Sequence, residues 1–460
     1  MTTRSAGLKR GVCAGARVLV GAAWLSLCAC ATYSDKTMVV RDAAAAGNLD
    51  LGVRELNRAM KTRDGELPQR WKRNTGLVVL ERGTVLHAQG QWQASARDME
   101  AAERELELLD ISKDGLGKIG RYIYSDSSAK YKTPPTERLA LNALNMLNYL
   151  ARGDLGGARV EAKRFTTMRE YLKQSDPDRA QLAFGSYLAA FTFDRLGEYD
   201  AAARHYDDAL QVRELAGLRG PLARLGTHTS YRTPRLAPYM DLAGLQDNAT
   251  PTPGPTGVPS EILVVVNTGR VPYKEPRRIP IGAAIGVAGA YFTGDTTLLE
   301  HSAMKVVVYP ELVAPGNVYT AAAVQVDGRA MRVEMVSDLG AATVSEFEDL
   351  KPRIIASAIT RMIARGVAAE AARGAVSEGP VLSLLTALAV EGAMVALDKP
   401  DTRSWTLLPD KIHMGRVSVP AGKHTIVVTL HGENGQREQR SIDVDVAEHG
   451  FAVVDVTTLR

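Results

Sequence analysis

The chain is poor in cysteine: it has three in 460 residues, Cys13, Cys28 and Cys30. From residue 31 onward there is none, which excludes a disulfide, a thiol nucleophile and a cysteine zinc site from that part of the chain. A chain of this length needs no covalent staple, because it can bury a large apolar core. We therefore expect its stability to come from packing.

An excess of charge is also absent once the N-terminal segment is set apart. The whole chain has 56 Lys and Arg against 52 Asp and Glu. Four of the basic residues lie among the first 29 residues, which contain no acid, so 52 of each sign remain. These four are Arg4, Lys9, Arg10 and Arg17. A net charge of zero argues against a basic nucleic-acid surface or a polybasic membrane patch, and we expect no nucleic acid among the partners.

The apolar run near the N-terminus, Val18–Ala29, is short. At about a dozen residues it falls below the roughly 20 that a membrane-spanning helix needs. A short run behind a basic segment is typical of a secretory signal peptide. The run ends in Leu27-Cys28-Ala29-Cys30, with a bulky residue, a small residue and a cysteine in the order that resembles the lipobox of bacterial lipoproteins.

The lipobox resemblance implies cleavage before Cys30 and lipidation of that cysteine. Residues 1–29 are then a signal peptide and residues 30–35 a lipidated tether, with acyl chains such as palmitate in the bilayer. More than one chain is needed for stable anchoring, since each buried CH₂ contributes about 0.8 kcal/mol. Ala31 follows the cysteine where an acid would redirect sorting, so similarity to Gram-negative lipoproteins favours the outer membrane, facing the periplasm.

Two other cleavage sites are open to the same sequence. A cut before Cys28 fits less well, because it places the bulky Leu27 directly before the cleaved bond. A plain signal peptide cleaved at the small residues Ala29 or Ala31 would leave no lipid anchor.

Residues 36–215 are rich in Ala, Leu, Arg and Glu and have helical periodicity. A three-residue pattern recurs four times in this region. It has a glycine, Leu or an aromatic residue two positions later, and usually Ala twelve positions after the glycine. The four occurrences are Gly47-Leu49-Ala59, Gly90-Trp92-Ala102, Gly153-Leu155-Phe165 and Gly197-Tyr199-Ala209. The pattern resembles the tetratricopeptide repeat (TPR), in which glycine reverses the chain between two closely packed helices. Spacings of 43, 63 and 44 residues, against about 34 in a regular array, predict degenerate units with inserts. An unrelated bundle of helical hairpins is the alternative.

TPR-like stacks form concave surfaces that bind peptides or proteins. The insert between the second and third units holds Arg121–Ser128 and Tyr131–Pro135, whose tyrosines either line a groove or pack the loop. The pairs Glu137/Arg138 and Glu161/Arg164 suit helix surfaces, and the second has the i, i+3 spacing of an ordinary ion pair.

Three stretches, taken in their order along the sequence, together span most of the chain after the signal segment. They are Glu137–Glu161, then Val264–Gly269 with Pro272–Lys274, then Asp401–Trp405 with Leu408-Pro409. Together they resemble an uncharacterised family of Gram-negative TPR-like envelope lipoproteins. The resemblance implies no activity, cofactor or catalytic residue. It associates the chain with envelope gene clusters that encode other small lipoproteins, which favours an assembly role.

Residues 216–260 are predicted to be a Pro/Gly/Thr-rich linker, because residues 246–259 contain four prolines and two glycines. Residues 261–400 are predicted to be a mixed α/β region. Its expected strands are Glu261–Asn267, Lys305–Tyr309 and Ala323–Val336, and its expected helices are 349–372 and Val381–Leu397. The glycine-spaced segment Ile279–Phe292 is interpreted as a buried loop-helix, with membrane contact as the alternative.

Residues 401–460 are predicted to form a small β-sandwich-like module. The expected strands are Lys411–Val419, Lys423–Leu430, Arg440–Val446 and Phe451–Thr457. The turn Pro420–His424 between the first two resembles that of a PEGA-type module. The predicted fold class is thus α+β and multidomain, with a TPR-like α-helical superhelix followed by a mixed β-rich domain and this module.

The residue patterns of known catalytic and metal sites are missing from the sequence. None of the eight histidines has a metal-ligand spacing, although His424, His431 and His449 fall in one module and could converge. There is no Gly-x-Ser-x-Gly elbow, and Gly115–Lys118 lacks the upstream glycine of a P-loop. We therefore predict no catalytic, metal or cofactor residue and no enzyme; an enzyme with dispersed residues is the alternative.

The leading hypothesis is a lipoprotein anchored through acylated Cys30 that organises other envelope proteins through its helical repeats. A lipoprotein that binds a ligand or glycan with its β-rich C-terminal half is the second hypothesis. A concave groove suited to a peptide would favour the first, and a deep polar pocket in the β half the second.

Overall fold

The computed structural model describes residues 31–106, 131, 133–174, 176–241, 259–291, 306–374 and 400–460. Cys30, the predicted signal peptide, most of the tyrosine-rich insert and the predicted helix Val381–Leu397 lie outside these residues. The chain divides into two compact units. The smaller comprises Met1–Thr37, Glu275–Glu311 and Pro352–Thr402; the larger comprises Met38–Lys274, Leu312–Lys351 and Arg403–Arg460.

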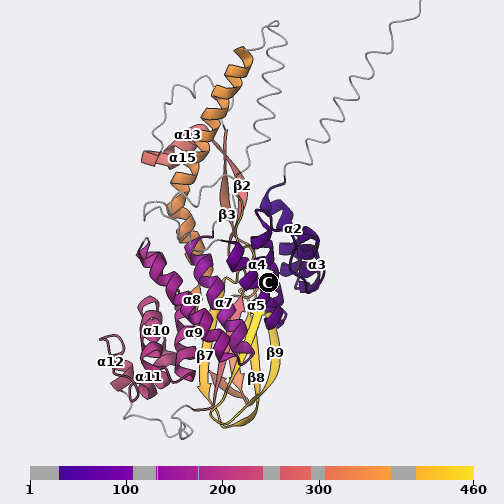
Figure 1. Ribbon diagram of the computed structural model, residues 1–460. Helices are drawn as coiled ribbons and strands as arrows, with labels where there is room; N and C mark the ends of the chain where they lie inside the picture. The colour runs from indigo at the N-terminus through magenta and orange to yellow at the C-terminus, as the bar shows by residue number, and fades with distance from the viewer. Residues whose placement is uncertain are drawn as a thin grey trace, which may run out of the picture. The chain divides into compact units, whose positions relative to one another are not determined.

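Four helical hairpins make up the N-terminal half (Figure 1). They are α2 (Tyr33–Ala45) with α3 (Leu49–Met60), α4 (Thr75–Ala88) with α5 (Trp92–Glu105), α7 (Pro135–Ala151) with α8 (Leu155–Lys173), and α9 (Ala183–Arg195) with α10 (Tyr199–Val212). From α3 to α10 each of these helices packs against the next, and α7 also contacts α9. The hairpins therefore form a continuous stack.

The four hairpin turns share one geometry. Each contains the glycine singled out in the sequence, at a φ of 74°, 72°, 71° and 75° for Gly47, Gly90, Gly153 and Gly197. In every turn the N–H after the glycine bonds to the carbonyl five residues back, which is the Schellman arrangement that ends a helix. A side chain at such a φ is strained, so the predicted role of these glycines is confirmed.

The position twelve residues after each glycine is buried in three of the four units. Ala102, Phe165 and Ala209 are fully buried, whereas Ala59 is exposed. The packing role expected for this position is therefore wrong in the first unit.

The predicted linker 216–260 is partly helical. It contains η3 (Ala216–Leu218), α11 (Arg219–Leu225) and α12 (Ala237–Met240). Leu218 at the end of η3 and Leu222 and Leu225 of α11 follow one another at helical spacing and are fully buried. Because leucines with helical spacing bury a face, residues 216–241 extend the helical half, and the prediction of a linker over the whole range was wrong.

The β half of the larger unit consists of two four-stranded sheets. One has the order β10-β1-β7-β6 and the other β5-β4-β8-β9. The strands are β1 (Glu261–Thr268), β4 (Ala321–Val326), β5 (Arg329–Met331), β6 (Glu334–Asp338), β7 (Lys411–Ser418), β8 (Gly422–His431), β9 (Arg437–Val446) and β10 (Phe451–Thr458). β1 pairs with β10 in parallel and with β7 antiparallel, so it lies inside the first sheet.

The first sheet is covered on both faces. Alternate residues of β1, including Ile262, Val264 and Val266, join a core with residues of β4 and β8 from the second sheet. The opposite face packs against helices: β10 contacts α4 and α7, and β6 contacts α9. All eight residues of β1 are buried as a result. The larger unit is thus layered as helices, sheet and sheet.

This topology corrects two predictions for the β half. The four C-terminal strands are present, but β7 and β10 belong to one sheet, β8 and β9 to the other, and each sheet is completed by strands from 261–338. A sandwich confined to residues 401–460 is therefore wrong in its extent. The single strand expected at Ala323–Val336 is three strands, because a turn at Asp327-Gly328 and a further break before Glu334 interrupt it.

The smaller unit contains a two-stranded sheet of β2 (Tyr273–Pro280) and β3 (Val306–Val313), the short helix α13 (Ile281–Ala288) and the later part of α15 (Leu339–Gly374). The predicted helix at 349–372 is confirmed within α15. In α13 only Ala284 and Ala288 are buried, so a helix is present at Ile279–Phe292 but its predicted burial is largely wrong. No helix in the described residues is long and apolar enough to cross a membrane.

Candidate interaction site on the helical layer

An irregular segment of the chain itself, with a turn at Thr406-Leu407, lies against α4 and α7. We call Arg403–Leu408 the strap. Glu81 of α4 accepts hydrogen bonds from the N–H of Thr406 at 2.7 Å, from its hydroxyl at 2.8 Å and from the N–H of Leu407 at 2.9 Å. The fully buried Trp405 donates its indole Nε1–H to the Thr84 hydroxyl at 2.8 Å. The strap is therefore held as a bound peptide would be.

A second buried carboxylate holds the strap from α7. Glu137 accepts the N–H of Trp405 at 3.0 Å and the hydroxyl of Tyr131 at 2.6 Å. Burial raises the pKa of Glu137. Glu137 is only 5% exposed, so the prediction that it lies on a helix surface was wrong. Arg138 instead donates to the Thr133 carbonyl. The predicted ion pair of Glu161 with Arg164 is confirmed at 2.8 Å, but Glu161 is buried, so its predicted place on a helix surface was also wrong.

The three sequence stretches that carried the family resemblance meet at this strap. Glu137 of the first contacts Trp405 of the third. The N–H of Val271, between the two parts of the second stretch, donates to the carbonyl of Leu408 at 2.9 Å. The N–H of Asp410 donates to the carbonyl of Thr268 at 3.1 Å. These residues build the junction of helices and sheet; their oxygens are occupied by backbone donors, which fits a structural role.

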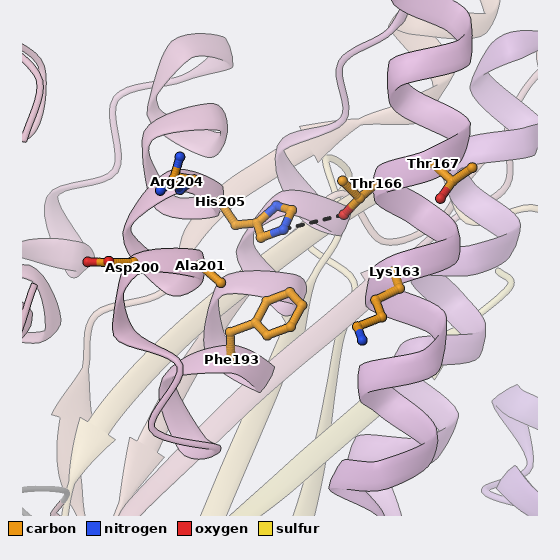
Figure 2. Close-up of a pocket in the computed structure, with 8 residues that line it drawn as sticks. All are labelled: Lys163, Thr166, Thr167, Phe193, Asp200, Ala201, Arg204 and His205. Carbon is orange, nitrogen blue, oxygen red and sulfur yellow. Dashed lines mark hydrogen bonds between the residues drawn. The ribbon is translucent and has the colours of Figure 1, made fainter. Parts of the chain in front are cut away.

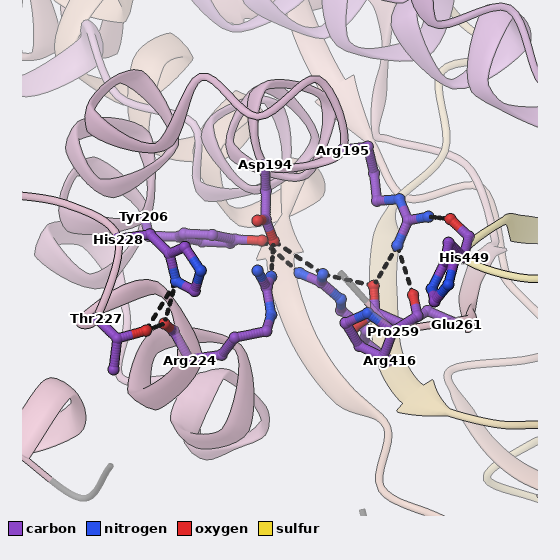
Figure 3. A network of polar contacts seen from close by, with 10 residues as sticks. All are labelled: Asp194, Arg195, Tyr206, Arg224, Thr227, His228, Pro259, Glu261, Arg416 and His449. Carbon is purple, nitrogen blue, oxygen red and sulfur yellow. Dashed lines mark hydrogen bonds and ion pairs between the residues drawn. The ribbon is translucent and has the colours of Figure 1, made fainter. Parts of the chain in front are cut away.

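A polar cluster lies where α9, α10 and α11 meet β1 and β7 (Figure 3). Arg416 of β7 contacts Asp194 of α9 at 2.9 Å, Glu261 of β1 at 2.6 Å and the Tyr206 hydroxyl of α10 at 2.6 Å. Arg224 of α11 reaches the same Asp194 oxygen at 2.5 Å. Burial alone would raise the pKa of Asp194, but the two guanidinium groups hold it below its usual value. The cluster joins α9, α10 and α11 to the first sheet.

The histidines of the C-terminal strands do not converge. His424 bonds to Asp327 at 2.7 Å. His431 ends β8, whereas His449 follows Val446, which pairs with the opposite end of that strand. Across the described residues, no group of three or more His, Cys, Asp or Glu side chains is placed to hold a metal ion.

An open hollow of about 590 Å³ lies on the outer side of the stack, between α8 and α10. Figure 2 shows Lys163 and Thr166 of α8 on one wall, with Phe193 and His205 opposite them. The Phe193 and His205 rings stack, with centroids 5.3 Å apart and planes 7° apart. A second hollow of about 630 Å³ adjoins the first, because Asp200 and its neighbour Ala201 line both. We call the two hollows the α8–α10 groove.

No family model, curated protein or solved structure matches this chain.

The aromatic floor of the groove carries no charge near neutral pH. Burial, together with the nearby Arg169 charge, lowers the pKa of His205 to about 4. The Thr166 hydroxyl donates to the Ala162 carbonyl at 2.8 Å, so it accepts from His205 Nε2 at 3.3 Å, and the ring proton is on Nε2. His205 thus acts as a neutral, flat surface beside Phe193.

The positive charge of the groove comes from its rim. α8 has five cationic side chains, and four of them pair with carboxylates: Arg159, Arg164, Arg169 and Lys173. The fifth, Lys163, lines the groove and is exposed, and it has no ion pair within the described chain. Arg204, the arginine of α10, lies over the Tyr231 ring at 4.9 Å and forms no salt bridge among the described residues, although its charge helps to lower the pKa of Asp200 one turn earlier.

None of the predicted site residues falls in the groove. Cys30 and residues 121–130 lie outside the described residues, and Tyr131 packs under the strap. The sequence does contain a signal that was missed: α8 and α10 each follow a turn glycine, Gly153 and Gly197, so Lys163 and Arg204 could have been placed on the second helix of two successive hairpins. Which cations are left without partners depends on residues up to 61 positions away and cannot be deduced from spacing.

Proposed function

We propose that this chain is a lipoprotein of the bacterial cell envelope, anchored through acylated Cys30, that binds partner proteins on the outer side of its helical stack. The lipobox-like Leu27–Cys30 supports the anchor. By that resemblance the protein lies at the outer membrane and faces the periplasm. The proposal assigns it no enzymatic role.

We infer that the four hairpins are degenerate TPR-like units. Four identical glycine turns and the contact of α7 with α9 across an intervening helix support this interpretation. Such stacks usually bind partners on their inner side, but here the chain's own strap and sheet occupy the face of α4, α7 and α9. Binding of a partner is therefore assigned to the outer side.

The α8–α10 groove is the single observation that carries the proposal. It is open, and its volume is in the range of binding pockets. Both hollows of the groove are lined by the helical half and by no residue of the two sheets. This favours a partner on the helices over a ligand or glycan in the β half.

In-cell photo-crosslinking tests the proposal. A photoreactive amino acid at Thr167, which is exposed in the groove, is compared with one at Arg104, which is exposed on α5 outside it. Point substitutions are used because deleting the whole helical half, residues 36–215, would expose the sheet residues that pack against these helices. We expect an envelope protein to be captured from Thr167 and not from Arg104. Capture from neither position, with the protein folded and membrane-bound, would refute a partner at this face.

A further inference from the structure

The α8–α10 groove combines unpaired positive charge with apolar surface. Lys163 and Arg204 supply the charge, and the stacked rings of Phe193 and His205 supply the floor. One turn before Lys163, Val160 is 50% exposed. The four other cations of α8 pair with carboxylates within the fold, so Lys163 is the α8 cation left for a partner; Asp200 is the one carboxylate that lines the first hollow.

We propose that this groove binds an acidic segment of a partner protein. Its carboxylates pair with Lys163 and Arg204, and an aromatic or aliphatic side chain between them packs on the Phe193–His205 floor. The inference rests on the proposed function and adds the chemistry of the partner. Ion pairs at a rim around an apolar centre are the usual arrangement of a protein interface.

The shape and chemistry of the groove favour a peptide over a small anion. Phosphate sites are commonly built from free backbone N–H groups at a helix N-terminus. Here Lys163, Thr166 and Thr167 come from the interior of α8, where the N–H groups bond within the helix. At the first turn of α10, Asp200 places a negative charge, and its carboxylate points away from α8 in Figure 2. The acidic segment is assigned to the first hollow, because Lys163 and Arg204 line it, whereas Glu198 and Asp200 line the second.

Fluorescence anisotropy with labelled peptides tests the inference on the purified chain from residue 31 onward. The probes are a peptide of Asp and Glu around a central Trp, and the same peptide with Asn and Gln in place of the acids. The charge-reversal variant is K163E/R204E. Its matched control is R54E/R104E, which reverses two exposed cations of α3 and α5 that have no ion pair in the described chain and lie outside the groove.

We expect the acidic peptide to bind, and to bind less tightly as salt is added. K163E/R204E should weaken binding about tenfold or more, while R54E/R104E should leave it within about twofold. Circular dichroism of both variants checks that they are folded. Equal binding of the neutral peptide, or equal binding by K163E/R204E, would overturn the inference.

Two further probes separate other anions from the peptide. Competition by inorganic phosphate as strong as by unlabelled peptide, or binding only to vesicles of phosphatidylethanolamine and phosphatidylglycerol, would also overturn it. A partner captured from Thr167 with no affinity for the acidic peptide would reject the acidic chemistry alone. If no protein is crosslinked from Thr167 in cells, the proposed function itself is rejected.

Discussion

Glu81→Gln changes charge and hydrogen bonding at one fully buried position under the strap. Burial raises the pKa of Glu81 from 4.5 to about 7, although its three donors act in the opposite direction. Between these pH values the folded state binds more protons than the unfolded state, so the stability gained by protonation is fully present below pH 4.5 and is lost as the pH rises through about 7. Since one pKa unit corresponds to about 1.4 kcal/mol, the loss is about 3 kcal/mol.

Glutamine cannot lose a proton, and only the oxygen of its amide group can accept hydrogen bonds, whereas its NH₂ group can only donate them. If its oxygen serves the N–H and hydroxyl of Thr406, its NH₂ group faces the N–H of Leu407. One buried donor is then left unsatisfied, at a cost of about 1–3 kcal/mol. E81Q should therefore be less stable than the wild type by that amount near pH 5. Near pH 8 the wild type has lost about 3 kcal/mol, so the difference should vanish or change sign.

Urea unfolding followed by tryptophan fluorescence measures this difference, because Trp405 is buried beside Glu81. Glu161 and Glu346, whose pKa burial also raises to about 7, are present in every variant and cancel. E433Q, at an exposed position between β8 and β9, is the control. A difference between E81Q and wild type that is equal at pH 5 and pH 8 would mean that the donors keep the carboxylate charged throughout, and would refute the reasoning.

Three other changes have defined outcomes. C30A should move the protein from the membrane to the soluble fraction; retention on membranes at high salt would contradict the lipid anchor. R416M removes the cation shared by two buried carboxylates and should cost about 3–5 kcal/mol in urea unfolding, and a loss below about 1 kcal/mol would contradict the role of the cluster. G185A places a methyl group 2.2 Å from the Phe165 ring and should cost about 1–3 kcal/mol, whereas G156A, 3.4 Å from its nearest neighbour, should be neutral or slightly stabilising; equal melting temperatures would contradict the packing described.

Local chemistry made part of this fold predictable. Turn glycines such as Gly153 could be recognised because only a residue without a side chain easily adopts the required φ, and the apolar run Ile262–Val266 had to be a buried strand. The leucines of α11 carried an equally local signal that the nearby prolines obscured. In contrast, strand order was not predictable, since β1 is flanked by β10 and β7, which lie far along the chain, and no local signal in their sequences names β1 as their neighbour.

The candidate site was less predictable than the fold. Lys163 and Arg164 are adjacent and similar in sequence, but only Arg164 meets carboxylates, those of Glu161 and of Glu103 in another hairpin. Whether a surface cation is free for a partner is thus decided by helix packing. The strap shows the same limit: the helical periodicity predicts the hairpins, but not that Trp405 and its neighbours pack against them.

The parallel pairing of β1 with β10 sets the order in which the larger unit can fold. Asn267 bonds to Thr457, 190 residues later. Until residues 451–458 are available for pairing, β1 lacks a hydrogen-bonding partner along one edge, and an apolar strand is exposed to aggregation. A stop codon before residue 451 would therefore remove an edge strand that pairs with β1 along its whole length and contacts α4 and α7. Chains shortened by these few residues should accumulate as misfolded protein and be degraded.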